Sequence, residues 1–134
     1  MGSYTSYGVQ YNGTTQYSSR AIVSTAVDNI SVIMWVKINS TPSTNFDVFN
    51  NGSSDANGYV IRVNSSRIFS WDITFVANLS SGYTLSTGTW YQLALIRTGG
   101  VAQCYVNAVA QGSTSSSSPN SPNGWTTIGA CQTL

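Results

Sequence analysis

The segment 86–107 constrains the fold more than any other part of the chain, because it has the pattern of two strands joined by a tight reversal. It reads Ser-Thr-Gly-Thr-Trp-Tyr-Gln-Leu-Ala-Leu-Ile-Arg-Thr-Gly-Gly-Val-Ala-Gln-Cys-Tyr-Val-Asn. Gly99 and Gly100 suit the positive φ angles of a two-residue turn, and apolar strands flank them on both sides. The segment therefore predicts an antiparallel β-hairpin.

The rest of the chain has the same character. Short apolar or alternating blocks are separated by turn residues every eight to twelve positions, and no stretch has helical periodicity. This pattern is typical of a sandwich or a barrel. Strands are predicted near 7–11, 15–18, 30–38, 45–49, 58–64, 67–76, 89–97, 101–107 and 125–130. The segment 112–124 has no apolar residue and is predicted to be a long surface loop.

The strand predicted at 30–38 is apolar on both faces. Its even-numbered residues are apolar, and so are Ile33 and Trp35 between them. A strand of this kind is typical of a position in the middle of a sheet that is covered on each side. Trp35 and Trp90 are accordingly predicted to lie in the core, and Trp71 to pack against the sheet.

The hairpin segment resembles the central signature of laminin-G-like domains, which belong to the concanavalin A-like lectin/glucanase superfamily. The shared features are a Gly-x-Trp start, an apolar strand that ends in Arg, a glycine turn and Tyr-Val-Asn. Segments 7–17, 30–37, 58–63 and 127–130 resemble further family strands in the expected order. The resemblance implies one domain over residues 1–134, an all-β, antiparallel two-sheet jelly-roll sandwich of the concanavalin A-like type.

Two departures from the family pattern lead to further expectations. The family's Tyr-Val-Asn-Gly ends here in Asn107 and Ala108, and Ala in a two-residue turn needs a positive φ that costs about 1 kcal/mol relative to Gly. A longer loop is therefore predicted at this point. The chain also stops at Leu134, before the family's final strand. Either that strand is dispensable, or an open sheet edge is left for another chain to complete.

The charge of the chain argues against several kinds of partner. Only 7% of the residues are charged, the net charge is +1, and the five cations are scattered along the sequence. Nucleic acid binding needs clustered Lys and Arg, so no nucleic acid partner is expected. No apolar run has the length of a membrane-spanning helix, and no export signal is visible, so no membrane partner is expected either.

The side chains that most catalysis needs are missing from this sequence. It contains no His and no Glu, and its only acids are Asp28, Asp47, Asp55 and Asp72. A Ser or Cys nucleophile therefore lacks its usual base, and no two Asp alternate on one predicted strand as a glycosidase pair would. Each Asp is instead predicted to serve a turn or a cap. We expect no enzyme activity and no resident metal or cofactor.

Calcium is the one cofactor that the sequence leaves open. In the segment 50–58, Asp55, Asn57 and backbone carbonyls could supply oxygen ligands to Ca²⁺. A flexible polar turn explains the same segment without a metal, and this is the preferred interpretation.

Cys104 and Cys131 are the only cysteines. Their predicted strands could be neighbours, so two alternatives stay open. One is a disulfide that stabilises the fold by about 3 kcal/mol, and the other is a pair of buried free thiols.

Aromatic and amide side chains in loop-like surroundings are the candidate binding residues, because a ring can stack on a sugar while amides bond its hydroxyls. Trp125, beside Asn123, is the first candidate. The remaining candidates are Tyr83, Asp55 and Asn57.

Two non-catalytic functions are expected from the whole sequence. The favoured one is a structural decoration or adhesion protein on a bacteriophage head or tail, located at the virion surface. A Ser-, Thr-, Asn-, Gly- and Tyr-rich exterior suits an outer surface, and the chain begins with Met1 and no export signal, as do proteins released by lysis. Its partners would be a capsid or tail protein, or further copies of the chain at an open sheet edge.

The alternative function is a carbohydrate-binding, lectin-like module of a secreted or cell-surface protein, with glycans as partners. An excised domain of a longer protein is also compatible with the Met-Gly-Ser start.

Overall fold

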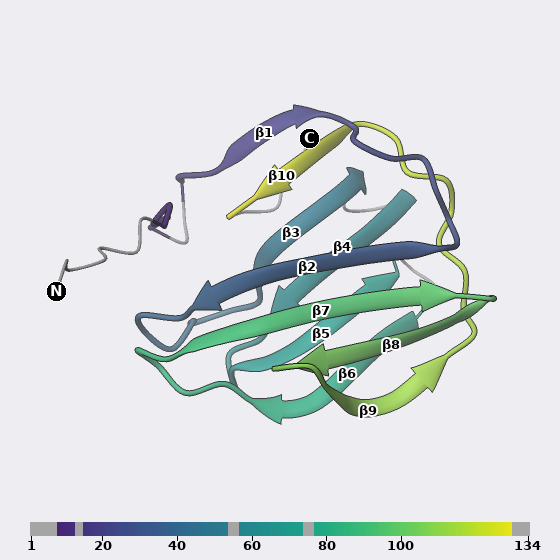
Figure 1. Ribbon diagram of the computed structural model, residues 1–134. Helices are drawn as coiled ribbons and strands as arrows, with labels where there is room; N and C mark the ends of the chain where they lie inside the picture. The colour runs from purple at the N-terminus through teal and green to yellow at the C-terminus, as the bar shows by residue number, and fades with distance from the viewer. Residues whose placement is uncertain (1–7, 13–14, 54–56, 74–76, 130–134) are drawn as a thin grey trace, which may run out of the picture.

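A computed structural model describes residues 8–12, 15–53, 57–73 and 77–129. The described residues form ten β-strands and no helix, arranged as two antiparallel sheets packed face to face (Figure 1). The predicted fold class, an all-β antiparallel two-sheet sandwich, is confirmed.

The larger sheet has six strands in the order β1-β10-β3-β4-β5-β6. Their bounds are β1 (Ser18–Ala21), β10 (Trp125–Ile128), β3 (Phe46–Ser53), β4 (Asn57–Val63), β5 (Ile68–Ile73) and β6 (Ala77–Thr84). The smaller sheet has four strands in the order β2-β7-β8-β9. Their bounds are β2 (Ile30–Lys37), β7 (Trp90–Thr98), β8 (Val101–Val106) and β9 (Val109–Ser115). β10 pairs with both β1 and β3, so the strand that pairs with the first strand is formed by residues 125–128.

The two sheets meet closely along one side of the sandwich and not along the other. On the β6 and β9 side the backbones touch, since a Cβ added to Gly112 would lie 2.2 Å from the carbonyl oxygen of Ser80. On the opposite side, β10 and β1 extend the six-stranded sheet past β2 (Figure 1). The connection between β1 and β2 covers part of this overhang, since the Val23 N–H donates to Thr126 Oγ1 at 3.0 Å and Asn51 Nδ2 donates to the Ser24 carbonyl at 2.9 Å.

The core lies between the sheets and is built by alternating inward residues of both. Phe69, Trp71 and Leu93 are fully buried there, which confirms the prediction for Trp71. Arg97 also points inward at one end of the sandwich, where its Nε donates to the carbonyl of Val27 at 3.0 Å. Its Nη1 donates to the carbonyl of Ser117 at 2.7 Å, so one buried guanidinium anchors two loops.

The hairpin predicted from the sequence is present. Thr98 pairs with Val101 across the two-residue turn, and both glycines have positive φ. The longer loop predicted at Asn107 and Ala108 is wrong, because these residues form a second two-residue turn with φ angles of 50° and 64°. Asn107 holds this turn in place: its N–H donates to the carbonyl of Gln92 at 2.8 Å, and its Oδ1 accepts from the Gln92 N–H at 3.0 Å.

Several strand predictions need correction. Residues 8–11 form no strand, and the strand predicted at 15–18 begins only at Ser18. β6 and β9 were not predicted, because Ser, Gly, Asn and Gln dominate both. The segment 112–124 is not a free loop throughout, since β9 runs to Ser115 and Pro119 and Pro122 are buried.

The central position predicted for residues 30–38 is also wrong. β2 is an edge strand of the four-stranded sheet, and within the described residues it pairs with β7 alone. One of its faces packs on the core and the other is exposed, which follows from the alternating burial along the strand. Trp35 and Trp90 are therefore surface residues, 63% and 43% exposed, and not core residues as predicted.

Candidate functional site

The outer face of the four-stranded sheet carries a cluster of exposed apolar and aromatic side chains. Directly paired residues of antiparallel strands point to the same face, so the register places Trp35 beside Gln92 and Lys37 beside Trp90. Ile33 pairs with Ala94, which pairs in turn with Tyr105. We call this surface the aromatic face; it comprises Ile33, Trp35, Trp90, Gln92, Ala94 and Tyr105.

The aromatic face is almost uncharged. Lys37 is the only ionisable side chain that β2, β7, β8 and β9 carry on this outer side apart from the Tyr105 phenol, and its Nζ lies 5.4 Å from the ring centroid of Trp90. Trp35 is 63% exposed and Ile33 is 60% exposed. Exposed rings next to amide groups can stack on an apolar ligand surface while the amides bond its polar groups. This chemistry suits a neutral, hydroxyl-rich ligand.

Sequence reasoning missed the aromatic face, although a signal for it was present. Trp35 shares its side of β2 with two polar residues, Ser31 four positions before it and Lys37 two positions after it. A face that carries Ser and Lys is typically solvated. The polar residues on this face therefore indicate a surface position for Trp35.

The candidate binding residues predicted from the sequence come together in part. Asn57 Nδ2 donates to Asn123 Oδ1 at 3.3 Å across 66 residues of sequence, and Trp125, 45% exposed, begins the strand that follows Asn123. The backbone beside them is tightly paired, since the Gly58 N–H donates to the carbonyl of Asn120 at 3.0 Å. A small polar rim with one aromatic ring results at this end of β4 and β10.

The other two candidate binding residues, Tyr83 and Asp55, are not shown in this group. Tyr83 lies on β6 and packs edge-to-face on Tyr91, with ring centroids 5.9 Å apart, as part of the shell around the core. Asp55 lies outside the described residues, and so does any calcium ligation that involves it. In the described part of the chain, no three His, Cys, Asp or Glu side chains gather in a group that could hold a metal.

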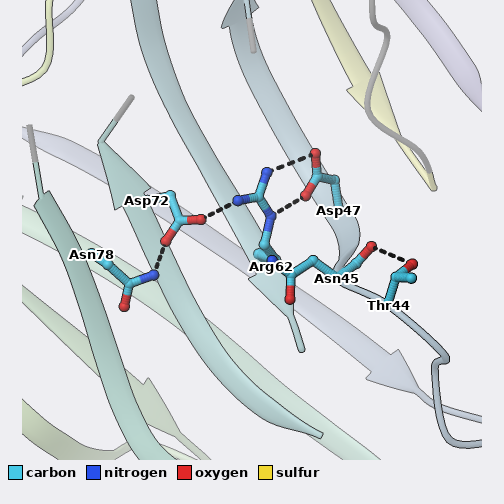
Figure 2. A network of polar contacts seen from close by, with 6 residues as sticks. All are labelled: Thr44, Asn45, Asp47, Arg62, Asp72 and Asn78. Carbon is cyan, nitrogen blue, oxygen red and sulfur yellow. Dashed lines mark hydrogen bonds and ion pairs between the residues drawn. The ribbon is translucent and has the colours of Figure 1, made fainter. Parts of the chain in front are cut away.

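Two carboxylates converge on one guanidinium on the six-stranded sheet (Figure 2). Arg62 on β4 donates from Nε to Asp47 Oδ1 at 2.5 Å, and its Nη1 donates to Asp72 Oδ2. Asn78 Nδ2 donates to the second oxygen of Asp72. The turn or cap role predicted for Asp47 and Asp72 is therefore wrong, because both lie within strands and serve an ion-pair network.

Burial raises the pKa of the Asp72 carboxyl above its ordinary value, and Asp47 adds to the rise. The charge of Arg62 and the hydrogen bonds from Asn78 and Arg62 act in the opposite direction. Asp28, by contrast, does serve a turn, since its Oδ2 accepts from the Gly100 N–H at 3.0 Å. All three acids are thus occupied by structural partners.

Cys104 is a free thiol in the structure and is fully buried. Its Sγ donates weakly to the carbonyl of Leu79 at 3.6 Å, and burial raises the pKa of the thiol to about 12. Cys131 lies outside the described residues.

The fold defines the class of protein: a two-sheet antiparallel jelly-roll sandwich with an exposed, nearly uncharged aromatic face. Residues 12–133 match the family described as the concanavalin A-like lectin/glucanases superfamily, in its laminin-G form, and the chain belongs to this family. Membership indicates a carbohydrate-binding or adhesion module. No curated protein and no solved structure gives a significant match to the chain. Among the residues that the structure describes, none forms a helix long and apolar enough to cross a membrane.

Proposed function

We propose that this protein is a non-catalytic recognition module whose aromatic face binds an uncharged glycan. The observation that carries the proposal is the exposure of Trp35 and Trp90 on one sheet face, with Gln92 directly opposite Trp35 and two residues from Trp90 on β7. A pyranose ring offers apolar C–H groups to an indole and hydroxyls to an amide. The near absence of charge on this face favours a neutral sugar over an acidic one.

The absence of catalysis is part of the proposal. Asp47 and Asp72 share one guanidinium, and Asp28 bonds a turn, so none of these carboxylates faces a substrate position unpaired. A glycosidase needs two carboxyl groups that are placed on either side of a scissile bond. The arrangement supports binding without turnover.

A glycan array followed by calorimetry with the best-bound sugar tests the proposed site. Trp35→Ala should weaken binding by about tenfold or more, which corresponds to 1.4 kcal/mol, because it removes one stacking surface. Trp125→Ala is the matched control, since it removes an exposed indole from the rim and leaves the aromatic face intact. Loss of binding only in Trp125→Ala would move the site to the rim. A pure chain that binds no glycan would end the proposal.

For the setting of this module we propose the surface of a virus particle, as a decoration or adhesion protein of a phage head or tail. A net charge of +1 and a charged fraction of 7% support this, because many copies can crowd on a symmetric shell with little mutual repulsion. Peptide mass spectrometry of purified particles should then detect the chain at stoichiometric abundance. Detection only in cell-surface or secreted fractions would replace the virion setting with the extracellular one.

A further inference from the structure

The three aromatic side chains of the aromatic face come from three different strands and lie at separate corners of it. Trp35 is on β2, Trp90 is on β7 and Tyr105 is on β8. Gln92 lies directly opposite Trp35 and two residues from Trp90 on β7. Tyr105 lies opposite Ala94, which is the next residue of β7 on this face. Gln92 and Ala94 therefore occupy the middle of the face, with the aromatic rings around them.

Strand geometry converts this register into distances between backbone positions. Neighbouring strands lie about 4.8 Å apart, and two residues of one strand span about 6.8 Å. The positions of Trp35 and Trp90 are therefore about 8 Å apart. Those of Trp35 and Tyr105, on either side of β7, are about 12 Å apart. A pyranose ring that packs on one aromatic ring at a contact distance of about 4 Å does not reach the ring at the far corner.

The aromatic face is open to solvent. Trp35 is 63% exposed, and Ile33, the neighbouring outer residue on β2, is 60% exposed. Ala94 lies between Ile33 and Tyr105 in the register and is only 7% exposed, so its short side chain leaves the middle of the face lower than its margins. A site for one small molecule typically encloses most of the surface of that molecule. An open face with a low middle suits a longer ligand that lies across it.

A side-chain amide is available in the middle of the face. Within the described part of the chain, Gln92 is bonded through its backbone to Asn107, which leaves its amide group for a ligand. The outer amide of the next strand, Gln103 on β8, is occupied instead. Its Nε2 donates to the carbonyl of Gln111 at 2.7 Å and to that of Cys104 at 3.1 Å. Polar recognition in the middle of this face therefore falls on Gln92.

The corner at Trp90 is fixed before any ligand arrives. Lys37 Nζ lies 5.4 Å from the centroid of the Trp90 ring. The N-terminal segment lies against the same ring, since a Cβ added to Gly8 would be 3.3 Å from it. A side chain that is already held in place loses little conformational entropy when a ligand binds. This corner therefore provides a rigid contact surface.

We propose that the aromatic face binds an inner segment of a linear, neutral polysaccharide, which crosses β7 from Trp35 to Tyr105 with about three sugar units in contact over the distance between them. Trp35 stacks on one unit, Gln92 bonds hydroxyls of the next, and Tyr105 contacts a later one. The chain continues beyond both ends of the face, because an open face needs no chain end. This inference rests on the proposed glycan-binding function and names its ligand class, a polymer chain and not a terminal sugar.

Calorimetry of the full chain with linear glucose, xylose and mannose oligosaccharides of one to six units tests the length of the site. In a series that binds, the affinity should rise at least about tenfold between the monosaccharide and the longer members, because further units reach further contacts. It should then level off at about three or four units, the length of the face. A hexasaccharide that is chemically blocked at its non-reducing end should bind as tightly as the unblocked one.

The other outcomes separate this inference from the proposed function. Full affinity for a monosaccharide, or loss of binding when the chain end is blocked, would overturn the polymer ligand and leave glycan binding intact. The same holds if none of the three series binds while a branched or terminal sugar binds on the glycan array. No binding of any glycan would remove the proposed function and this inference together.

Protein variants test the path of the chain across the face. Tyr105→Ala should weaken hexasaccharide binding about tenfold and leave disaccharide binding unchanged, because a disaccharide stacked on Trp35 does not reach the far corner. Trp35→Ala should weaken the binding of both. Tyr17→Ala is the matched control, since it removes a phenol that is 46% exposed and lies outside the aromatic face. Equal losses for both sugars in Tyr105→Ala would contradict a chain that extends from one corner to the other.

Discussion

Arg62 Nε lies 2.5 Å from Oδ1 of Asp47, and the same guanidinium donates to Asp72 on the other side of β4. One cation therefore faces two carboxylates on neighbouring strands. The pKa of Asp72 is raised, because burial disfavours its charged form more than Arg62 favours it. This imbalance has a measurable effect on stability.

The free energy of unfolding of the Asp72→Asn variant should rise relative to that of the natural protein as the pH rises. The folded state holds the Asp72 proton more tightly than the unfolded chain does, since the folded pKa is raised above the ordinary value of 3.8. The stabilisation from this group is complete below the unfolded pKa and is lost as the pH rises through the folded pKa. Urea unfolding at about pH 3 and about pH 7 measures the difference between the two proteins. A difference that is equal at both pH values would contradict this account.

Ala108→Gly should stabilise the fold by about 1 kcal/mol. Ala108 has a φ of 64°, which an L-residue with a Cβ adopts at a cost that Gly does not bear. Thermal unfolding of the two proteins measures the gain. The control is Ala110→Gly on the adjoining strand β9, where no positive φ is relieved and Gly should destabilise. An Ala108→Gly protein that melts lower than the natural one would show that the turn is not strained.

Local chemistry explains which parts of the fold were predictable. The hairpin at Gly99 and Gly100 is specified by its turn residues and by the apolar strands beside them, so the sequence predicts it well. Trp35 is exposed because it lies on the outer face of β2, which it shares with Ser31 and Lys37. Ile33 on the same face is apolar as well, so the sequence of this strand also fits a strand that is covered on both sides. β6 and β9 escaped prediction because polar residues dominate both sequences. Each is held by backbone pairing with its neighbour and by contact with the other sheet, and β6 adds Leu79 to the core.

The candidate site residues also divide into those that the sequence can group and those that only the fold brings together. Residues close in sequence, such as Asn123 and Trp125, can be grouped from the sequence, and their contact with Asn57 requires the fold. Tyr83 has the same loop-like surroundings in the sequence, yet it packs on Tyr91 beside the core. The aromatic face joins side chains from three strands, so it exists only after the register is known.

Cys104 should be unreactive in the folded protein. It is fully buried, and burial raises its pKa to about 12, so only on the order of 10⁻⁴ of the thiol is ionised at about pH 8. A Cys131→Ser chain isolates its signal in a colorimetric thiol assay. No reaction is expected over the time in which the urea-unfolded chain reacts fully. Rapid reaction of the folded chain would show that the strands around Cys104 open readily.

Gly112→Ala should destabilise the fold more than Gly88→Ala does, although the two glycines have nearly the same backbone angle. Their φ values are 70° and 75°, so an added Cβ is strained by about 1 kcal/mol in both. At Gly88 nothing lies within 4 Å of the new atom, whereas at Gly112 the carbonyl oxygen of Ser80 lies 2.2 Å away. That oxygen belongs to β6, so β9 must shift away from the other sheet, at an additional cost of about 1–3 kcal/mol. Urea unfolding of the two variants measures the excess, and equal losses would mean that the sheets do not meet along β6 and β9.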